Sequence, residues 1–173
     1  MSRSLAPTLA VSHGLLRVLV MLNWLFGLLV LGLLIFSLID GPFFMEAIGF
    51  PTGGFGTPIL GARLIMLLGL ASVPLAHILF TRLLAIVGTV WSRDPFVARN
   101  AERLRACAWA VLGLEVVHLL VGAVAAAAST QYQQLDLDWN FSPTGLLAVL
   151  LLFVLAQVFA QGARMREELE GTV

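Results

Sequence analysis

The sequence predicts an all-α integral membrane protein with four transmembrane helices in an antiparallel bundle. Of its 173 residues, 60% are hydrophobic and 12% are charged, whereas soluble domains are about 45–50% apolar. Apolar stretches long enough to cross a bilayer lie at about residues 15–39, 60–90, 104–128 and 145–163. Together these spans form a single membrane domain covering residues 1–173.

The arginines predict the orientation. The chain has no lysine, and eight of its ten arginines gather near the amino end, between the second and third spans, and near the carboxyl end. These eight are Arg3, Arg17, Arg93, Arg99, Arg103, Arg105, Arg164 and Arg166. Short cytoplasmic loops retain positive charge. We therefore expect a multi-pass membrane protein with both termini and loop 91–103 in the cytoplasm, and loops 40–59 and 129–144 outside.

The first span is uninterrupted, whereas the second contains a proline. Val18–Ile39 contains no charged residue and reaches about 30 Å as a helix, so we interpret it as a retained transmembrane helix and not as a cleaved leader. The second span is longer than a bilayer requires. Pro74 near its middle removes a backbone donor and predicts a kink.

The last two spans begin with recognisable start signals. Asp94 can accept hydrogen bonds from first-turn amides, and Pro95 suits the first helical position. Residues 95–105 are therefore predicted to form a short amphipathic extension of the third span. Ser142-Pro143 is predicted to open the fourth span in the same way.

Composition and motifs exclude several classes of function. The formal net charge is zero, so no basic field favours direct binding of nucleic acid. Cys107 is the only cysteine, which excludes an intrachain disulfide and a CxxC redox pair. The glycine-rich segment 49–58 lacks the Gly-Lys-Ser/Thr ending of a phosphate loop, and no catalytic motif is found. We expect no enzyme activity, no metal and no cofactor.

Ionisable residues inside the spans are the first candidate site. Arg82 and His77 belong to the second span, and Glu115 and His118 lie three residues apart in the third. Counted from Trp91, Arg82 lies about 13 Å deep, and counted from Arg105, Glu115 lies about 15 Å deep, so the two are predicted to meet. Their cluster is either an interhelical polar clamp or a proton or ion relay.

The tail after the fourth span is the second candidate site. Arg164 and Arg166 come first, and Glu167 and Glu168 follow. The arginines can reach lipid phosphates. The tail is either a solvated helix end that fixes the topology or a docking surface for a cytosolic partner.

Two segments in the second half resemble a known family. These are Asp94-Pro95-Phe96-Val97, followed by Asn100, Arg103 and Leu104, and the stretch Leu152–Glu168. Over about residues 88–173 the chain resembles the DUF twenty-nine-seventy-five family of small four-helix bacterial membrane proteins, although Gly171 stands where that family tends to have leucine.

The resemblance implies a function but no catalytic residues. Members of that family look like partners of small helix-turn-helix transcription regulators, which draws attention to the cytoplasmic elements. The docking candidates are Asp94, Arg99, Asn100, Arg103, Arg164, Glu167 and Glu168. The leading hypothesis is a non-enzymatic regulatory partner of such a regulator. The alternatives are a small transporter or an ion- or proton-conducting homo-oligomer that uses Glu115, His118 and Arg82, and a membrane enzyme acting on lipid.

Overall fold

The described residues form four long helices and one short helix. The computed structural model describes residues 5–49, 57–91, 97–128 and 142–170, and these parts contain no strand. The helices are α1 (Leu5–Ile39), α2 (Gly41–Ala47), α3 (Thr57–Trp91), α4 (Ala98–Ala128) and α5 (Pro143–Glu170). All but α2 are long and apolar enough to cross a membrane. The predicted all-α, four-span membrane architecture is confirmed.

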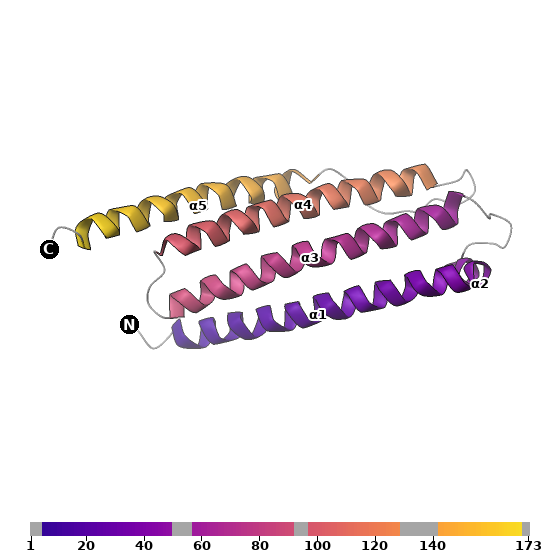
Figure 1. Ribbon diagram of the computed structural model, residues 1–173, viewed down its shortest axis with the longest axis horizontal. Helices are drawn as coiled ribbons and strands as arrows, with labels where there is room; N and C mark the ends of the chain where they lie inside the picture. The colour runs from indigo at the N-terminus through magenta and orange to yellow at the C-terminus, as the bar shows by residue number, and fades with distance from the viewer. Residues whose placement is uncertain (1–4, 50–56, 92–96, 129–141, 171–173) are drawn as a thin grey trace.

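The four long helices run antiparallel and lie side by side in the order α1, α3, α4, α5 (Figure 1). Thus α3 and α4 have a long neighbour on each side, while α1 and α5 form the edges of the row. We call the end where α1 and α4 begin, and where α3 and α5 end, the arginine-rich end. Its arginines in the described helices are Arg17, Arg82, Arg99, Arg103, Arg105, Arg164 and Arg166.

Helix α5 is displaced along the row. Gly145 in its first turn lies against Glu115, near the middle of α4. At the other end, Arg164 shares a cleft with Ala98, the first residue of α4. Residues 165–170 of α5 therefore run past α4 at the arginine-rich end (Figure 1).

Three helices extend beyond the predicted apolar spans. Helix α1 begins at Leu5 and not near residue 15, because proline is tolerated in a first turn and Pro7 lies there. Helix α4 begins at Ala98, within the predicted amphipathic extension 95–105. Helix α5 continues to Glu170, so the charged tail remains helical.

The first connecting segment contains a helix that the sequence analysis did not predict. Asp40 is the N-cap of α2, and its Oδ1 accepts a hydrogen bond from the Phe43 amide at 3.1 Å. The ring of Phe36 in α1 makes edge contacts with Phe43 and Phe44, with centroid distances of 5.9 and 6.5 Å. The cap and these aromatic contacts fold the chain back against α1. Most of the glycine-rich segment lies outside the described residues.

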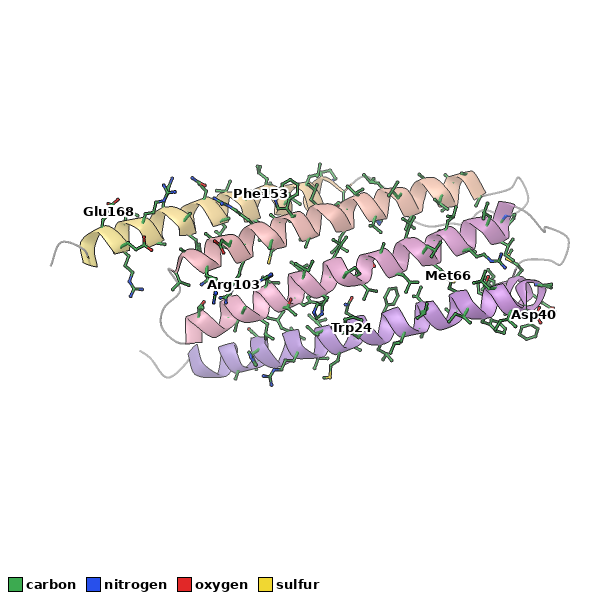
Figure 2. All side chains as sticks on the ribbon, viewed as in Figure 1. Trp24, Asp40, Met66, Arg103, Phe153 and Glu168 are labelled. Carbon is green, nitrogen blue, oxygen red and sulfur yellow. The ribbon has the colours of Figure 1, made fainter. Side chains whose placement is uncertain are left out.

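The helices meet through small side chains and expose large ones. A Cβ atom on Gly27 would come within 3.2 Å of Val73, and one on Gly61 would overlap Ala128. Cys107 and Ala108 are fully buried in α4. In contrast, many leucine, isoleucine and phenylalanine side chains face outward along the four helices (Figure 2). This pattern suits a bilayer, where close packing of small residues brings helices together and apolar side chains contact lipid.

Candidate functional site

Hydrogen bonds fix the register of α3 against α4 at the arginine-rich end. Asn100 donates from Nδ2 to Thr89 Oγ1 at 2.7 Å. Arg103 donates from Nη1 to the Ala85 carbonyl oxygen at 3.1 Å and to Asn100 Oδ1 at 2.9 Å. These three bonds join a buried amide, a guanidinium and a hydroxyl into one polar network between the two helices.

This register separates Arg82 from Glu115, which the sequence analysis predicted to meet. Arg82 lies three residues before Ala85 and therefore faces the turn of α4 three residues beyond Arg103. Glu115 lies nine residues further along α4, about 13 Å away along the helix axis. In the part of the chain that the structure describes, no ion pair joins Arg82 to Glu115. The predicted clamp between them is wrong.

Glu115 instead faces the first turn of α5. Its carboxylate occupies the space that a Cβ atom on Gly145 would fill, so only glycine permits this approach. The Gly145 amide donates to Ser142, to Oγ at 3.2 Å and to the carbonyl oxygen at 3.1 Å, which caps α5. The carboxylate thus lies near the positive end of the α5 dipole, an arrangement that favours a negative charge.

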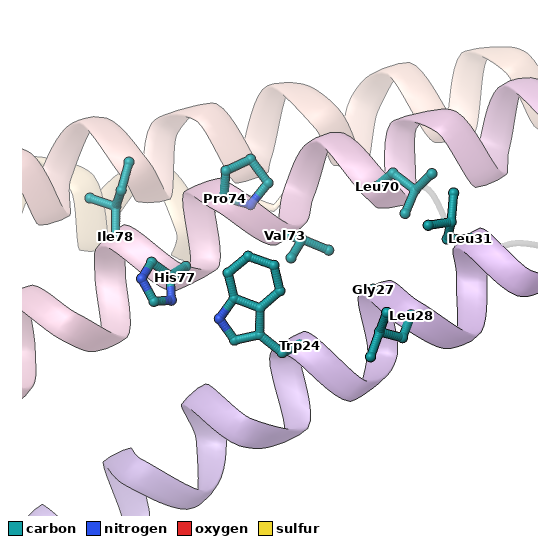
Figure 3. Close-up of a pocket in the computed structure, with 9 residues that line it drawn as sticks. All are labelled: Trp24, Gly27, Leu28, Leu31, Leu70, Val73, Pro74, His77 and Ile78. Carbon is teal, nitrogen blue, oxygen red and sulfur yellow. The ribbon is translucent and has the colours of Figure 1, made fainter.

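His77 faces α1, on another side of α3. Its ring contacts Trp24 edge to face, with a centroid distance of 5.5 Å and an interplanar angle of 65°. Both residues line an apolar groove of about 420 Å³ between α1 and α3, together with Pro74 and Val73 (Figure 3). His77 Nδ1 is buried without a hydrogen-bond partner among the described residues. The lining of this groove is almost wholly apolar.

The four predicted intramembrane groups are therefore distributed over the row. His118 and Arg82 are exposed, Glu115 is half-buried against α5, and His77 is half-buried against α1. Among the described residues, no three His, Cys, Asp or Glu side chains are close enough to hold a metal ion. A continuous relay through all four groups is not present in this arrangement.

Two predicted docking residues belong to the α3–α4 interface. Asn100 is fully buried and Arg103 is half-buried, and both take part in the polar network with Thr89 and Ala85. Their side chains are therefore committed to holding α4 against α3. Asn100 therefore does not face a cytosolic partner, whereas Arg103 keeps part of its side chain exposed. Exposure had been inferred from charge and position alone.

The other docking candidates remain accessible. Arg99, Arg164, Glu167 and Glu168 are exposed, and Glu168 lies near the tip of α5 (Figure 2). Asp94 lies outside the described residues. The exposed candidates therefore come from the beginning of α4 and the end of α5, which are neighbours in the row.

A polar cleft of about 260 Å³ separates these two helix ends. Its lining residues are Ala98, Ala101, Glu102, Arg105, Ala160, Ala163, Arg164 and Glu167. The sequence analysis did not include Glu102 and Arg105 among the docking candidates. Their spacing of three residues, which places them on one helix face, was the signal that could have identified them.

Arg63 is a further residue that the sequence analysis missed. Its Nε donates to Ser37 Oγ at 3.0 Å and its Nη2 donates to the Ser37 carbonyl oxygen at 2.5 Å. Ser37 is fully buried near the end of α1, where carbonyl groups lack helical partners and the dipole is negative. Arg63 therefore caps α1 and ties it to α3, a structural role.

Comparison with known proteins gives no relative. No protein-family model, no curated protein and no solved structure matches the chain significantly. The fold and sites define a multi-pass α-helical membrane protein with a charged end built from α4 and α5.

Proposed function

We propose that this chain is a non-enzymatic regulatory protein of the bacterial inner membrane that binds a small helix-turn-helix transcription regulator at its arginine-rich end. The observation that carries the proposal is the exposed, mixed-charge tip formed where α5 runs past the start of α4. Charge of both signs in one place favours recognition of a polar protein surface, because complementary charges steer and orient a partner. The class of partner follows from the family resemblance of residues 88–173.

The orientation in this proposal follows from the same arginines. Seven of the ten arginines lie at the arginine-rich end within the described helices: Arg17, Arg82, Arg99, Arg103, Arg105, Arg164 and Arg166. Asp40 and Glu46 lie near the opposite end. The positive-inside rule then assigns the arginine-rich end to the cytoplasm, where a soluble transcription regulator can reach it.

Cysteine labelling tests the orientation. In a Cys107→Ser background, Ala98→Cys and Met165→Cys should react with a membrane-impermeant maleimide only after the cytoplasmic side is opened. Ala47→Cys should react in intact cells, because α2 is at the opposite end of the molecule. All three positions are exposed. Labelling of Ala98→Cys in intact cells would reverse the proposed orientation.

The position of α5 supports a simple mechanism. As an edge helix it packs against α4, so a shift of α5 alters the charged tip and leaves the α1–α3–α4 contacts in place. A stimulus in the membrane that favours one of two α4–α5 arrangements would change the exposure of the docking surface. In this proposal the protein switches between two α4–α5 arrangements, and the docking surface is accessible to the regulator in one of them.

Charge reversal tests the docking surface. The proposal predicts that a small helix-turn-helix regulator is encoded beside the gene, and Arg99→Glu combined with Glu168→Arg should abolish its capture, measured by co-purification. Folding should be preserved, since exposed charges contribute about 0–1 kcal/mol each. Glu46→Arg, an exposed change at the opposite end, is the matched control and should leave capture intact. Equal capture by the double variant and the control would remove this surface from the proposal.

Ion or proton handling is the second candidate, and one observation favours it. Within the described residues, the Glu115 carboxylate makes no hydrogen bond or ion pair, although it lies inside a span. An ionisable group at such a depth is costly and is commonly functional. This candidate requires a pH-dependent flux in proteoliposomes that Glu115→Gln abolishes.

A further inference from the structure

The cleft between α4 and α5 lies where both helices change from apolar to charged. Between residues 106 and 128 of α4, Glu115 and His118 are the only charged residues or histidines. Residues 143–163 of α5 contain no charged residue and no histidine. Charged residues occupy both helices from this boundary to the arginine-rich end. The boundary of each helix falls inside the same cleft, which in a bilayer places the cleft at the level of the phospholipid headgroups.

Alanines create the space in the cleft. Half of the lining residues are alanines, whose side chains end at Cβ: Ala98, Ala101, Ala160 and Ala163. The charged walls consist of Glu102 and Arg105 from α4, and Arg164 and Glu167 from α5. Each helix therefore supplies one guanidinium and one carboxylate to a cavity of about 260 Å³.

These four charges do not neutralise one another. In the described parts of the chain, no hydrogen bond or ion pair occupies the side chains of Glu102, Arg105, Arg164 or Glu167. Glu102 and Arg164 are exposed at the cleft, so a ligand can reach them. Charges of both signs that face one space and remain unpaired match a ligand that carries both signs itself.

We propose that this cleft binds the headgroup of a zwitterionic phospholipid that carries a primary ammonium group. Arg105 and Arg164 would hold the phosphate, because a guanidinium donates paired hydrogen bonds to phosphate oxygens. Glu102 and Glu167 would accept hydrogen bonds from the ammonium, which has three donors. The acyl chains would then extend from the boundary along the apolar surfaces of α4 and α5.

The carboxylates distinguish this ligand from an anionic lipid. An anionic headgroup would gain from the two arginines but would be repelled by Glu102 and Glu167, whereas the ammonium of a zwitterion gains from both pairs. The inference concerns the walls of the cleft and depends neither on the orientation of the protein nor on its soluble partner.

Native mass spectrometry of the purified, delipidated full chain can test the site with three lipids. Dioleoyl-phosphatidylethanolamine should bind more tightly than the phosphatidylcholine and phosphatidylglycerol analogues. Arg105→Gln with Arg164→Gln should weaken phosphatidylethanolamine binding about tenfold or more, and so should Glu102→Gln with Glu167→Gln, since each pair removes charge-assisted hydrogen bonds. The double variant Glu102→Gln with Glu167→Gln should also bind phosphatidylglycerol more tightly than the unmodified chain does, because it no longer repels an anionic headgroup.

Two further variants separate binding from folding and from unspecific charge. Ala98→Leu fills the cleft without changing any charge, and it should weaken phosphatidylethanolamine binding like the charge variants. Arg17→Gln removes an exposed arginine of α1, away from the cleft, and should leave binding unchanged.

The proposal fails if phosphatidylglycerol binds the unmodified chain as tightly as phosphatidylethanolamine does. It also fails if the double variant Glu102→Gln with Glu167→Gln binds phosphatidylethanolamine as tightly as the unmodified chain. The two double variants, at Arg105 and Arg164 and at Glu102 and Glu167, can also be tested for capture of the soluble regulator. If they abolish this capture while lipid binding is retained, the cleft is a protein-docking site and the lipid assignment is wrong. Loss of lipid selectivity with intact regulator capture supports the lipid site and leaves the docking proposal standing.

Discussion

Replacing Gly61 with valine is expected to separate α3 from α4 and to lower thermal stability in detergent. Even a single Cβ atom at this position would overlap the Ala128 side chain, which is a Cβ fixed to the α4 backbone and cannot rotate away. The helices must therefore move apart. Overpacking of this kind costs about 1–3 kcal/mol, and each kcal/mol lowers Tm by about 2–4 °C in a chain of this size.

Gly32→Ala is the matched control for this substitution. Gly32 also lies within a long apolar helix, but a Cβ atom there would meet nothing within 4 Å. The alanine should leave Tm unchanged or raise it slightly, because alanine favours helix by about 0.5–1 kcal/mol over glycine. A Gly61→Val protein as stable as Gly32→Ala would show that the close α3–α4 contact is absent.

Replacing Asn100 with alanine is expected to destabilise the same helix pair from its other end. Asn100 is fully buried, donates to Thr89 and accepts from Arg103. Its removal deletes the interhelical bond to Thr89, whose hydroxyl keeps only its bond to the Ile86 carbonyl oxygen, and leaves part of the Arg103 guanidinium without a partner, which costs about 1–3 kcal/mol. Thermal unfolding in detergent measures the loss.

The neighbouring residue provides the control for Asn100. Arg99 is adjacent in sequence but exposed, so Arg99→Ala should change stability by about 0.5 kcal/mol or less. Asn100→Asp keeps the acceptor for Arg103 and should recover part of the loss. If Asn100→Ala and Arg99→Ala have equal effects on Tm, the buried network does not hold α3 and α4 together.

These expected effects mark where the sequence analysis succeeded and where it failed at the arginine-rich end. Asn100 and Arg103 were singled out as docking residues, whereas the structure places both in the hydrogen-bonded α3–α4 interface. Charge and hydropathy identify residues that need polar surroundings. They do not distinguish a polar group in solvent from one satisfied by an adjacent helix, such as Asn100 against Thr89.

The failed Arg82–Glu115 pair has a different cause. Counting Arg82 from Trp91 and Glu115 from Arg105 gives them similar depths. The structure instead aligns Trp91 with the residue just before Ala98, because Ala85 faces Arg103. The depth of Glu115 was therefore underestimated by about eight residues, or roughly 12 Å. Depth counting needs a common reference for both helices, and only the packed pair supplies one.

By itself, the sequence determined the four spans, the helical extension before Leu104 and the accumulation of arginine at one end, because hydropathy and charge act on each segment separately. The tertiary structure alone decided the order of helices in the row, the offset of α5 and the partners of the polar residues. Contacts such as Gly61 with Ala128 and Gly145 with Glu115 set the helix register through side-chain shape. Shape complementarity between distant segments is a property of pairs, and no single segment encodes it.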